Sequence, residues 1–369
     1  MASPRLTAPW VGESDISAIY HITSRIHDRE FLFDDLGKTE FLKLMRIYED
    51  FCGVHVLSHA VLDNHFHILV EVPPRPADGI SDAELVRRLH LVMKAPQVEL
   101  IEKRLADLSS EKATEKGRKA YHELREQHLS RMWDLSKFMK PIKQRFSRWF
   151  NEKNDRVGTL WEQRFDSALL EQSEVSSTIG AYIDLNPIRA KVKGVEKPED
   201  YHWCSYAEAL VGNSKARNGI ARLLYHTDHT WHEYKANIEV SDDYTWDKIH
   251  ARYRTFLYEE GRSCYQEESL EGPDGKMQKR GGFTDAEIAE IIAKGGKLTI
   301  REELLHRCKF FSKGAVIGSQ SFIEKVIDQL KAKNYWPVAK QRKRERHAHD
   351  TQLTINSTPI STLRSVKLE

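Results

Sequence analysis

Apolar and polar positions alternate through residues 62–72, and this alternation predicts a β-strand with two different faces. Successive strand side chains point to opposite sides, so residues two apart share a face. One face carries Phe66, Ile68, Val70 and Val72. The other carries His65, His67, Leu69 and Glu71. The apolar face must therefore pack against a core, and the two imidazoles point the same way from the other face.

The segments before this strand have equally clear patterns. Residues 18–25 are rich in β-forming side chains and predict a strand. Residues 39–52 have apolar positions at the three-to-four spacing of an amphipathic helix, with Gly53 suited to its end. Residues 54–62 predict a second strand, which the short Asp63-Asn64 turn joins to the histidine strand as an antiparallel hairpin.

The following segments alternate between helix and strand patterns. Residues 81–93 predict a helix, and residues 95–134 predict a charged, solvated helical insertion. Residues 136–153 predict a helix with one aromatic side and one basic side, which includes Arg145 and Arg148. That basic side is either a solvated face or a face for nucleic acid.

Residues 168–170 predict another strand, and Ser173 is suited to cap a helix that Pro187 disturbs or ends. The whole series predicts an α+β fold in which helices cover an antiparallel sheet of the ferredoxin-like kind.

The pattern divides the chain into a domain over residues 1–210, a bridge over 211–280, a small helical module over 281–335 and a basic tail over 336–369. Three helix-start signatures mark the module: Thr284-x-x-Glu287, Thr299-x-x-Glu302 and Ser321-x-x-Glu324. They fit a helix-turn-helix or a plain helical bundle. Residues 331–349 hold seven basic side chains and one acid, which predicts a disordered tail suited to phosphate backbones.

Composition narrows the class of protein. The 369 residues carry a net charge of +2, so any contact with nucleic acid must be local. No apolar run approaches the ~18 residues of a transmembrane helix. The first residues lack the basic and then apolar segments of a signal peptide. The four cysteines are scattered without a C-x-x-C pair, as in reduced cytosolic proteins. We expect a cytoplasmic protein with no membrane partner.

The candidate chemistry combines the two histidines with Tyr182 and Asn186, which lie four apart on the predicted helix. Each feature alone also occurs in ordinary cores, where buried tyrosines and H-x-H pairs are common. Together, two imidazoles and one amide are three neutral ligands that leave open positions on a divalent cation for phosphate oxygens. A phenol with a pKa of ~10 needs such a cation and nearby positive charge to act as a nucleophile.

These residues lie within longer segments that resemble the single-tyrosine HUH transposases, and within them the REP-associated tyrosine transposases. The matching segments are Tyr20-His21-Ile22-Thr23-Ser24-Arg25, Asp63-Asn64-His65-Phe66-His67-Ile68-Leu69, Gly158-Thr159-Leu160-Trp161-Glu162-Gln163-Arg164-Phe165, Tyr182-Ile183-Asp184-Leu185-Asn186-Pro187-Ile188-Arg189-Ala190 and Pro198-Glu199-Asp200-Tyr201-His202-Trp203-Cys204-Ser205-Tyr206. They cover roughly residues 15–210 and leave the insertion and the chain beyond about residue 240 unmatched.

The resemblance implies an HUH domain that cleaves and rejoins DNA. It implies that His65, His67 and Asn186 hold Mg²⁺ or Mn²⁺, although two imidazoles also accept zinc. The asparagine at the third ligand position resembles the REP-associated branch of the family, because the insertion-sequence branch has glutamine at that position.

By the same resemblance, Tyr182 is the nucleophile and forms a 5′-phosphotyrosine. The expected partner is single-stranded or hairpin DNA, with Arg25, Arg145, Arg148 and Arg164 as candidate phosphate contacts. A homodimer is an open alternative to a single copy.

Two other functions stay open at this point. A DNA-binding regulator could keep the same fold without catalysis. A zinc-dependent hydrolase of the amidohydrolase kind also uses H-x-H, but it needs repeated strand–helix units. Here the H-x-H follows a hairpin, the eightfold alternation is missing, and the tyrosine would be unexplained.

Overall fold

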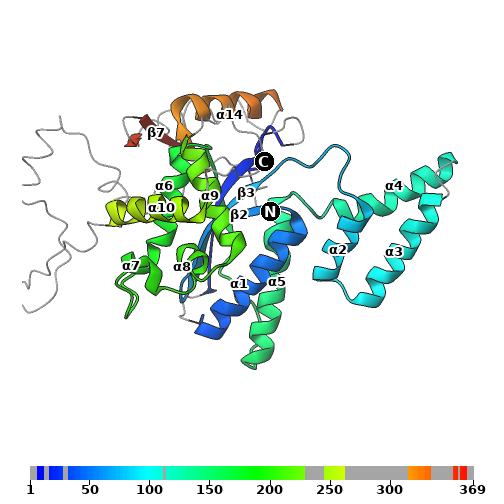
Figure 1. Ribbon diagram of the computed structural model, residues 1–369, viewed down its shortest axis with the longest axis horizontal. Helices are drawn as coiled ribbons and strands as arrows, with labels where there is room; N and C mark the ends of the chain where they lie inside the picture. The colour runs from blue at the N-terminus through cyan, green and yellow to red at the C-terminus, as the bar shows by residue number, and fades with distance from the viewer. Residues whose placement is uncertain are drawn as a thin grey trace, which may run out of the picture.

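The computed structural model describes residues 6–11, 16–27, 32–110, 114–228, 245–261, 315–333, 352–355 and 358–363. It has an α+β fold in which helices cover a single mixed sheet (Figure 1). The predicted fold class is therefore confirmed.

Four strands form the part of the sheet that the sequence predicted. They are β1 (Ala18–Arg25), β2 (His55–Val61), β3 (His65–Val72) and β4 (Asp166–Leu170). Their spatial order is β2-β3-β1-β4, and each adjacent pair is antiparallel. Helices α1 (Asp35–Cys52) and α5 (Leu135–Lys153) lie between strands in the sequence. This order and these connections are those of a ferredoxin-like sheet.

The apolar face of β3 packs against α1 and α5. Phe66 on β3 lies 4.6 Å from Phe41 on α1, and Phe41 lies 5.5 Å from Phe146 on α5, between ring centroids. Asp34 caps the start of α1 by accepting a hydrogen bond from the Gly37 amide, and Gly53 ends it in the left-handed conformation. Trp161 is partly buried and packs on the same cluster.

Shorter helices cover the opposite face of the sheet. They are α6 (Glu174–Asp184), α8 (Ser205–Leu210), α9 (Ser214–Asp228) and α10 (Trp246–Gly261). Their apolar side chains form a second core with Leu57 of β2 and Leu69 of β3. This core extends past residue 210, so the predicted domain boundary at that residue is wrong.

The chain after residue 315 extends the same sheet. Strand β5 (Val316–Ser319) runs parallel to β4, and β7 (Thr358–Leu363) and β6 (Gln352–Ile355) follow it outward. Helix α14 (Gln320–Ala332) joins the first core through Phe322 and Val326. These elements belong to the main body, contrary to the predicted separate module, and two strands lie where a disordered tail was predicted.

One predicted helix start is also displaced. Ser319 rather than Ser321 caps α14, because the Ser319 hydroxyl accepts a hydrogen bond from the Phe322 amide at 3.2 Å. The signatures at Thr284 and Thr299 lie outside the described residues, as does most of the basic run.

The predicted insertion is a group of helices beside the sheet, on the right in Figure 1. It contains α3 (Ala95–Ser110) and α4 (Glu115–Leu129), which follow α2 (Asp82–Val92). A narrow buried strip that includes Val98, Leu105 and Tyr121 holds these helices together. None of the helices in the described ranges is long and apolar enough to cross a membrane.

Helix α9 approaches β2 so closely that only glycine fits at one position. A Cβ added to Gly219 would lie 3.0 Å from the Leu57 carbonyl oxygen and still closer to that of Val56. Both neighbours are backbone atoms of β2, which pairing with β3 holds in the sheet, so they cannot rotate away.

We therefore expect Gly219→Ala to lower the free energy of unfolding by about 1–2 kcal/mol, despite alanine's higher helix propensity. Urea denaturation measures this change. Asn218→Ala, at the preceding position of the same helix, is the control and should be neutral or stabilising. Equal stability of Gly219→Ala and the wild type would contradict this close approach of the helix to the strand.

Helix α10 holds α6 through a buried carboxylate. Asp184 is fully buried and accepts hydrogen bonds from the Tyr253 hydroxyl at 2.7 Å and from the Tyr206 amide at 3.1 Å. Burial raises the pKa of Asp184 to about 7, and the hydrogen bond from Tyr253 opposes that rise. The position of α6 thus depends on a residue beyond the predicted domain.

Tyr253→Phe should lower the free energy of unfolding by about 1–3 kcal/mol, because it removes a donor from a buried carboxylate. The loss should grow as pH rises through 7, since Tyr253 favours the charged form of Asp184. Unfolding in urea at pH 6 and pH 8 tests both statements. Tyr121→Phe is the matched control: its hydroxyl donates to Asp82, whose side chain is 36% exposed, so water can replace it. A loss as small as that of the control would refute the role of Tyr253.

Candidate functional site

The candidate site begins with the two histidines of β3. His65 and His67 point from the face of β3 that α6 covers, and His67 is only 6% exposed. The Nδ1 atom of His65 lies 2.7 Å from the Asn64 side-chain oxygen. The Nδ1 atom of His67 lies 3.0 Å from Nε2 of His21, a residue of β1. Asn64 of the hairpin and His21 of β1 therefore hold the two imidazole rings by their Nδ1 atoms.

Helix α6 brings Tyr182 to these histidines. Its ring centroid lies 5.9 Å from that of His67 and 6.3 Å from that of His21, in edge-to-face contacts. The Ser173 hydroxyl caps the helix, as predicted, by accepting a hydrogen bond from the Val175 amide. Tyr182 is 3% exposed, so the phenol is almost covered in this structure.

Asn186 lies one turn beyond Tyr182 despite a break in the helix. Helix α6 ends at Asp184, and the short α7 (Asn186–Arg189) begins with Pro187 in its first turn. The Asn186 side-chain amide donates a hydrogen bond to the Tyr182 carbonyl oxygen at 2.9 Å. That bond uses the amide nitrogen and holds the side chain next to the tyrosine.

Both histidines of β3 are neutral near pH 7. Burial lowers the pKa of His65 to about 4, with a further contribution from Arg25 and an opposing one from Asp63. Burial also lowers the pKa of His67 well below its usual value, and the neighbouring histidines and arginines add to the effect. Each ring therefore keeps a nitrogen lone pair, as a metal ligand must.

The donor atoms at this site fit a divalent cation. Because Asn64 engages Nδ1 of His65 and His21 engages Nδ1 of His67, Nε2 is the atom each ring has for a metal. Among the described residues there is no group of three His, Cys, Asp or Glu side chains that could hold a metal ion. A third ligand would therefore come from another residue type, and the Asn186 amide next to Tyr182 is the candidate from the sequence.

The four predicted arginines divide into two pairs. Arg25 pairs with His65 in the β1–β3 register, and the Glu162 amide donates to the Arg25 carbonyl at 3.0 Å, which places the segment of Arg164 beside this end of the sheet. Arg145 and Arg148 lie on α5, which packs on the opposite face. Arg25 therefore lies beside His65 and near the segment of Arg164, whereas Arg145 and Arg148 belong to a helix on the other face of the sheet.

Lys143 departs from the predicted basic side of α5. It is 9% exposed, and its ammonium group donates to the Ser24 hydroxyl at 2.7 Å and to the Gln163 carbonyl at 3.0 Å. This lysine ties the segment 158–165 to the end of β1. Its role is structural within the described contacts, whereas the sequence pattern placed it on the basic side of the helix, which was either solvated or a face for nucleic acid.

Sequence reasoning missed two residues of the cluster, His21 and Arg189. The Arg189 guanidinium carbon lies 4.6 Å from the centroid of the Tyr182 ring. The strand period of residues 18–25 was the available signal for His21, because it shares a face with Arg25. The spacing of seven between Tyr182 and Arg189, about two helical turns, was the signal for Arg189.

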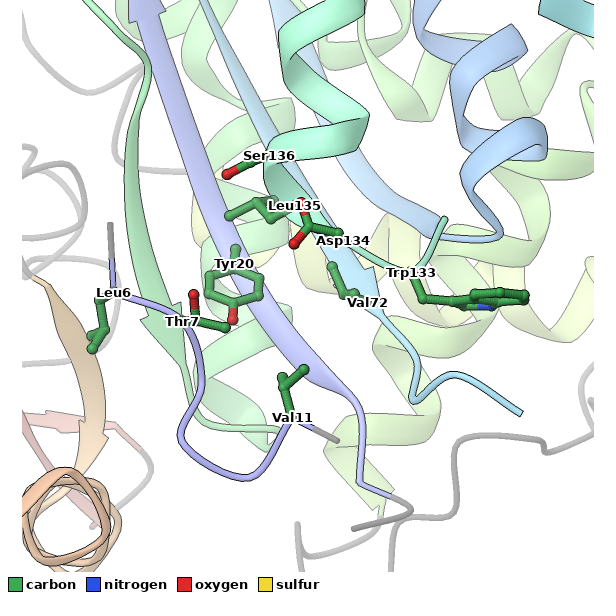
Figure 2. Close-up of a pocket in the computed structure, with 9 residues that line it drawn as sticks. All are labelled: Leu6, Thr7, Val11, Tyr20, Val72, Trp133, Asp134, Leu135 and Ser136. Atoms are coloured by element: carbon green, nitrogen blue, oxygen red, sulfur yellow. The ribbon is translucent and has the colours of Figure 1, made fainter. Parts of the chain in front are cut away.

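A small cavity lies elsewhere in the molecule. Its lining includes Tyr20, Val72 and Asp134, so it is next to the start of β1 and the end of β3 (Figure 2). His65 lies at the other end of β3, and Tyr20 points to the opposite face of the sheet. The cavity volume of about 30 Å³ suits one or two water molecules. It is not part of the candidate site.

Comparison with known proteins adds little. No family model matches the sequence, and no curated protein matches it. One similar solved structure is described as "Structure of the REP associates tyrosine transposase bound to a REP hairpin". It is 11% identical, with 57% of this chain and 87% of that chain covered and a TM-score of 0.35. A likeness at this level is a distant one in fold, and it carries no argument about the chemistry of the site.

Proposed function

We propose that this chain is a metal-dependent transposase or endonuclease of single-stranded DNA that cleaves and rejoins strands through a 5′-phosphotyrosine intermediate. One observation carries the proposal: Tyr182 of α6 and His67 of β3 meet in one buried cluster, with Asn186 one turn beyond the tyrosine. The sequence pattern required these distant segments to meet, and the resemblance of the motifs supplies the reaction class.

In the proposed reaction the Tyr182 oxygen attacks a DNA phosphodiester. A bond forms between that oxygen and phosphorus, the bond from phosphorus to the 3′-oxygen breaks, and the leaving strand takes up a proton as a 3′-hydroxyl. Attack by a 3′-hydroxyl reverses the step and rejoins strands without ATP. Nε2 of His65, Nε2 of His67 and Oδ1 of Asn186 would hold Mg²⁺ or Mn²⁺, which would polarise the phosphate.

The arginines give this site its affinity for an anion. Arg25 lies beside His65 and Arg189 lies over the Tyr182 ring, so both belong to the cluster where the scissile phosphate would bind. Because Tyr182 is 3% exposed, the Arg189 side chain must move from the ring toward the phosphate when DNA binds. Arg164 would contact the same stretch of the DNA backbone. Arg145 and Arg148 would contact only DNA that reaches the opposite face of the sheet.

A second function has one observation in its favour. The burial of Tyr182 also suits a DNA-binding regulator in which the tyrosine packs and does not react. The zinc-dependent hydrolase has less support, since the described part of the chain has no cluster of three His, Cys, Asp or Glu ligands.

Incubation with a labelled single-stranded oligonucleotide and Mn²⁺ separates the first two functions. The wild type should form a covalent adduct that survives SDS, and Tyr182→Phe should form none while it binds DNA within about threefold of the wild type, because only one hydroxyl is lost. Tyr225→Phe on α9 is the control and should react normally.

Single-stranded or hairpin DNA should react and blunt duplex should not. Binding of DNA by the wild type without any adduct would favour the regulator, and an adduct with Tyr182→Phe would refute the assignment of the nucleophile.

The metal dependence gives a second test with its own pH profile. EDTA or His67→Ala should reduce cleavage by at least about 100-fold, because the ligand set is lost. Since the pKa values of His65 and His67 are lowered, Mn²⁺ affinity should be constant from pH 8 to pH 6 and should fall only toward pH 4. Titration of the wild type with Mn²⁺ at each pH measures this. Cleavage at the full rate in EDTA would exclude a role for the metal. A loss of Mn²⁺ affinity near pH 6.5 would show that burial does not lower the pKa values of the two histidines.

A further inference from the structure

The contact between His21 and His67 is an interaction within the site that the sequence did not predict. His21 is 1% exposed, and its ring stacks on that of His67 with centroids 5.2 Å apart and planes 20° apart. In the β1–β3 register His67 pairs with Thr23, so His21 is its diagonal neighbour on the same face. The two ring nitrogens that meet, Nε2 of His21 and Nδ1 of His67, are 3.0 Å apart.

A hydrogen bond between two neutral imidazoles has two possible directions. If His21 donates from Nε2, then His67 carries its proton on Nε2 and has no lone pair there for a metal. If His67 donates from Nδ1, then its Nε2 lone pair is available. The direction of this one hydrogen bond therefore decides whether His67 can be a ligand.

The other histidine of the pair shows which direction the site requires. Nδ1 of His65 lies 2.7 Å from the Asn64 amide oxygen, and an amide oxygen only accepts hydrogen bonds. His65 must therefore donate from Nδ1, which leaves its Nε2 lone pair available. The two histidines present the same nitrogen only if His21 also acts as an acceptor.

We propose that His21 is a positioning residue that accepts the hydrogen bond from Nδ1 of His67 and so holds His67 in its metal-binding tautomer. This inference rests on the proposed function, because it concerns a ligand of the proposed metal. The same His21 ring makes an edge contact with Tyr182, with centroids 6.3 Å apart. One buried side chain thus fixes the orientation of the ligand and contacts the nucleophile.

The tautomer can be observed directly, without metal or DNA. Long-range ¹H–¹⁵N spectra of the full chain with ¹⁵N-labelled histidine distinguish a protonated Nδ1 from a protonated Nε2, and His67→Ala identifies the signals of His67. We expect His67 in the wild type to carry its proton on Nδ1 at pH 7.5. A proton on Nε2 would overturn the proposal.

Mn²⁺ binding by the variants measures the consequence. His21→Leu removes the acceptor and should weaken Mn²⁺ binding by about 10–100-fold, as is usual when the partner of a metal-binding histidine is lost. His21→Gln places an amide oxygen near the position of Nε2 and should restore affinity to within about threefold of the wild type. His55→Leu, at the far end of β2, is the control and should leave the affinity unchanged.

Equal affinity of His21→Leu and the wild type would overturn the proposal. If the leucine variant does not fold, the wild-type spectrum and the glutamine variant still decide, because a glutamine variant 10-fold weaker than the wild type would count against an acceptor role. A wild type that binds no Mn²⁺ but shows His67 protonated on Nδ1 would refute the metal assignment and leave the His21 hydrogen bond established.

Discussion

The two-residue period of β3 is the constraint on which both the fold and the candidate site depend. Phe66 and Ile68 point into the core under α1 and α5, so their neighbours His65 and His67 must point to the other face. A shift of one residue would place the imidazoles in the apolar core and the phenylalanine under α6. Strands β1 and β2 pair with β3 on its two sides, so hydrogen bonds from both directions oppose such a shift.

The position of the tyrosine depends on close packing of helices over that second face. Gly180 of α6 lies against Leu223 of α9, where an added Cβ would come 2.6 Å from the leucine Cδ1 atom. Gly219 brings α9 equally close to the backbone of β2. The ends of α6 are then held by Ser173 and by the hydrogen bonds to Asp184. Tyr182 therefore reaches His67 because small residues let the helices approach the sheet and each other.

Local pattern was enough to predict the elements that carry the chemistry. Strand β1 has the predicted bounds, Gly53 and Ser173 end and begin helices as expected, and Pro187 interrupts the helix after Tyr182. These features depend on residues near in sequence, where propensity and capping act. The pairing of β5 with β4 joins residues about 150 apart, and a four-residue strand has too little pattern to predict such a partner.

The difference between contacts near in sequence and contacts far apart in sequence also explains what was missed at single residues. Lys143 follows the basic period of α5, yet its ammonium group is buried because Ser24 and Gln163, far away in sequence, offer it acceptors. His21 lies in a strand whose pattern gives its face but not its diagonal neighbour, which depends on the register with β3. The candidate ligands and nucleophile could thus be named from the sequence, whereas the contacts of His21 and Lys143 could not.

The electrostatics of the cluster connect burial with the proposed reaction. Burial keeps His65 and His67 neutral, so the proposed ligands bring no negative charge to a divalent cation. Arg25 and Arg189 add positive charge beside them, which by itself opposes a cation and favours an anion. Under the proposed function a DNA phosphate resolves this opposition, because it supplies the negative charge that both the cation and the guanidinium groups need. The metal and the DNA should then strengthen each other's binding.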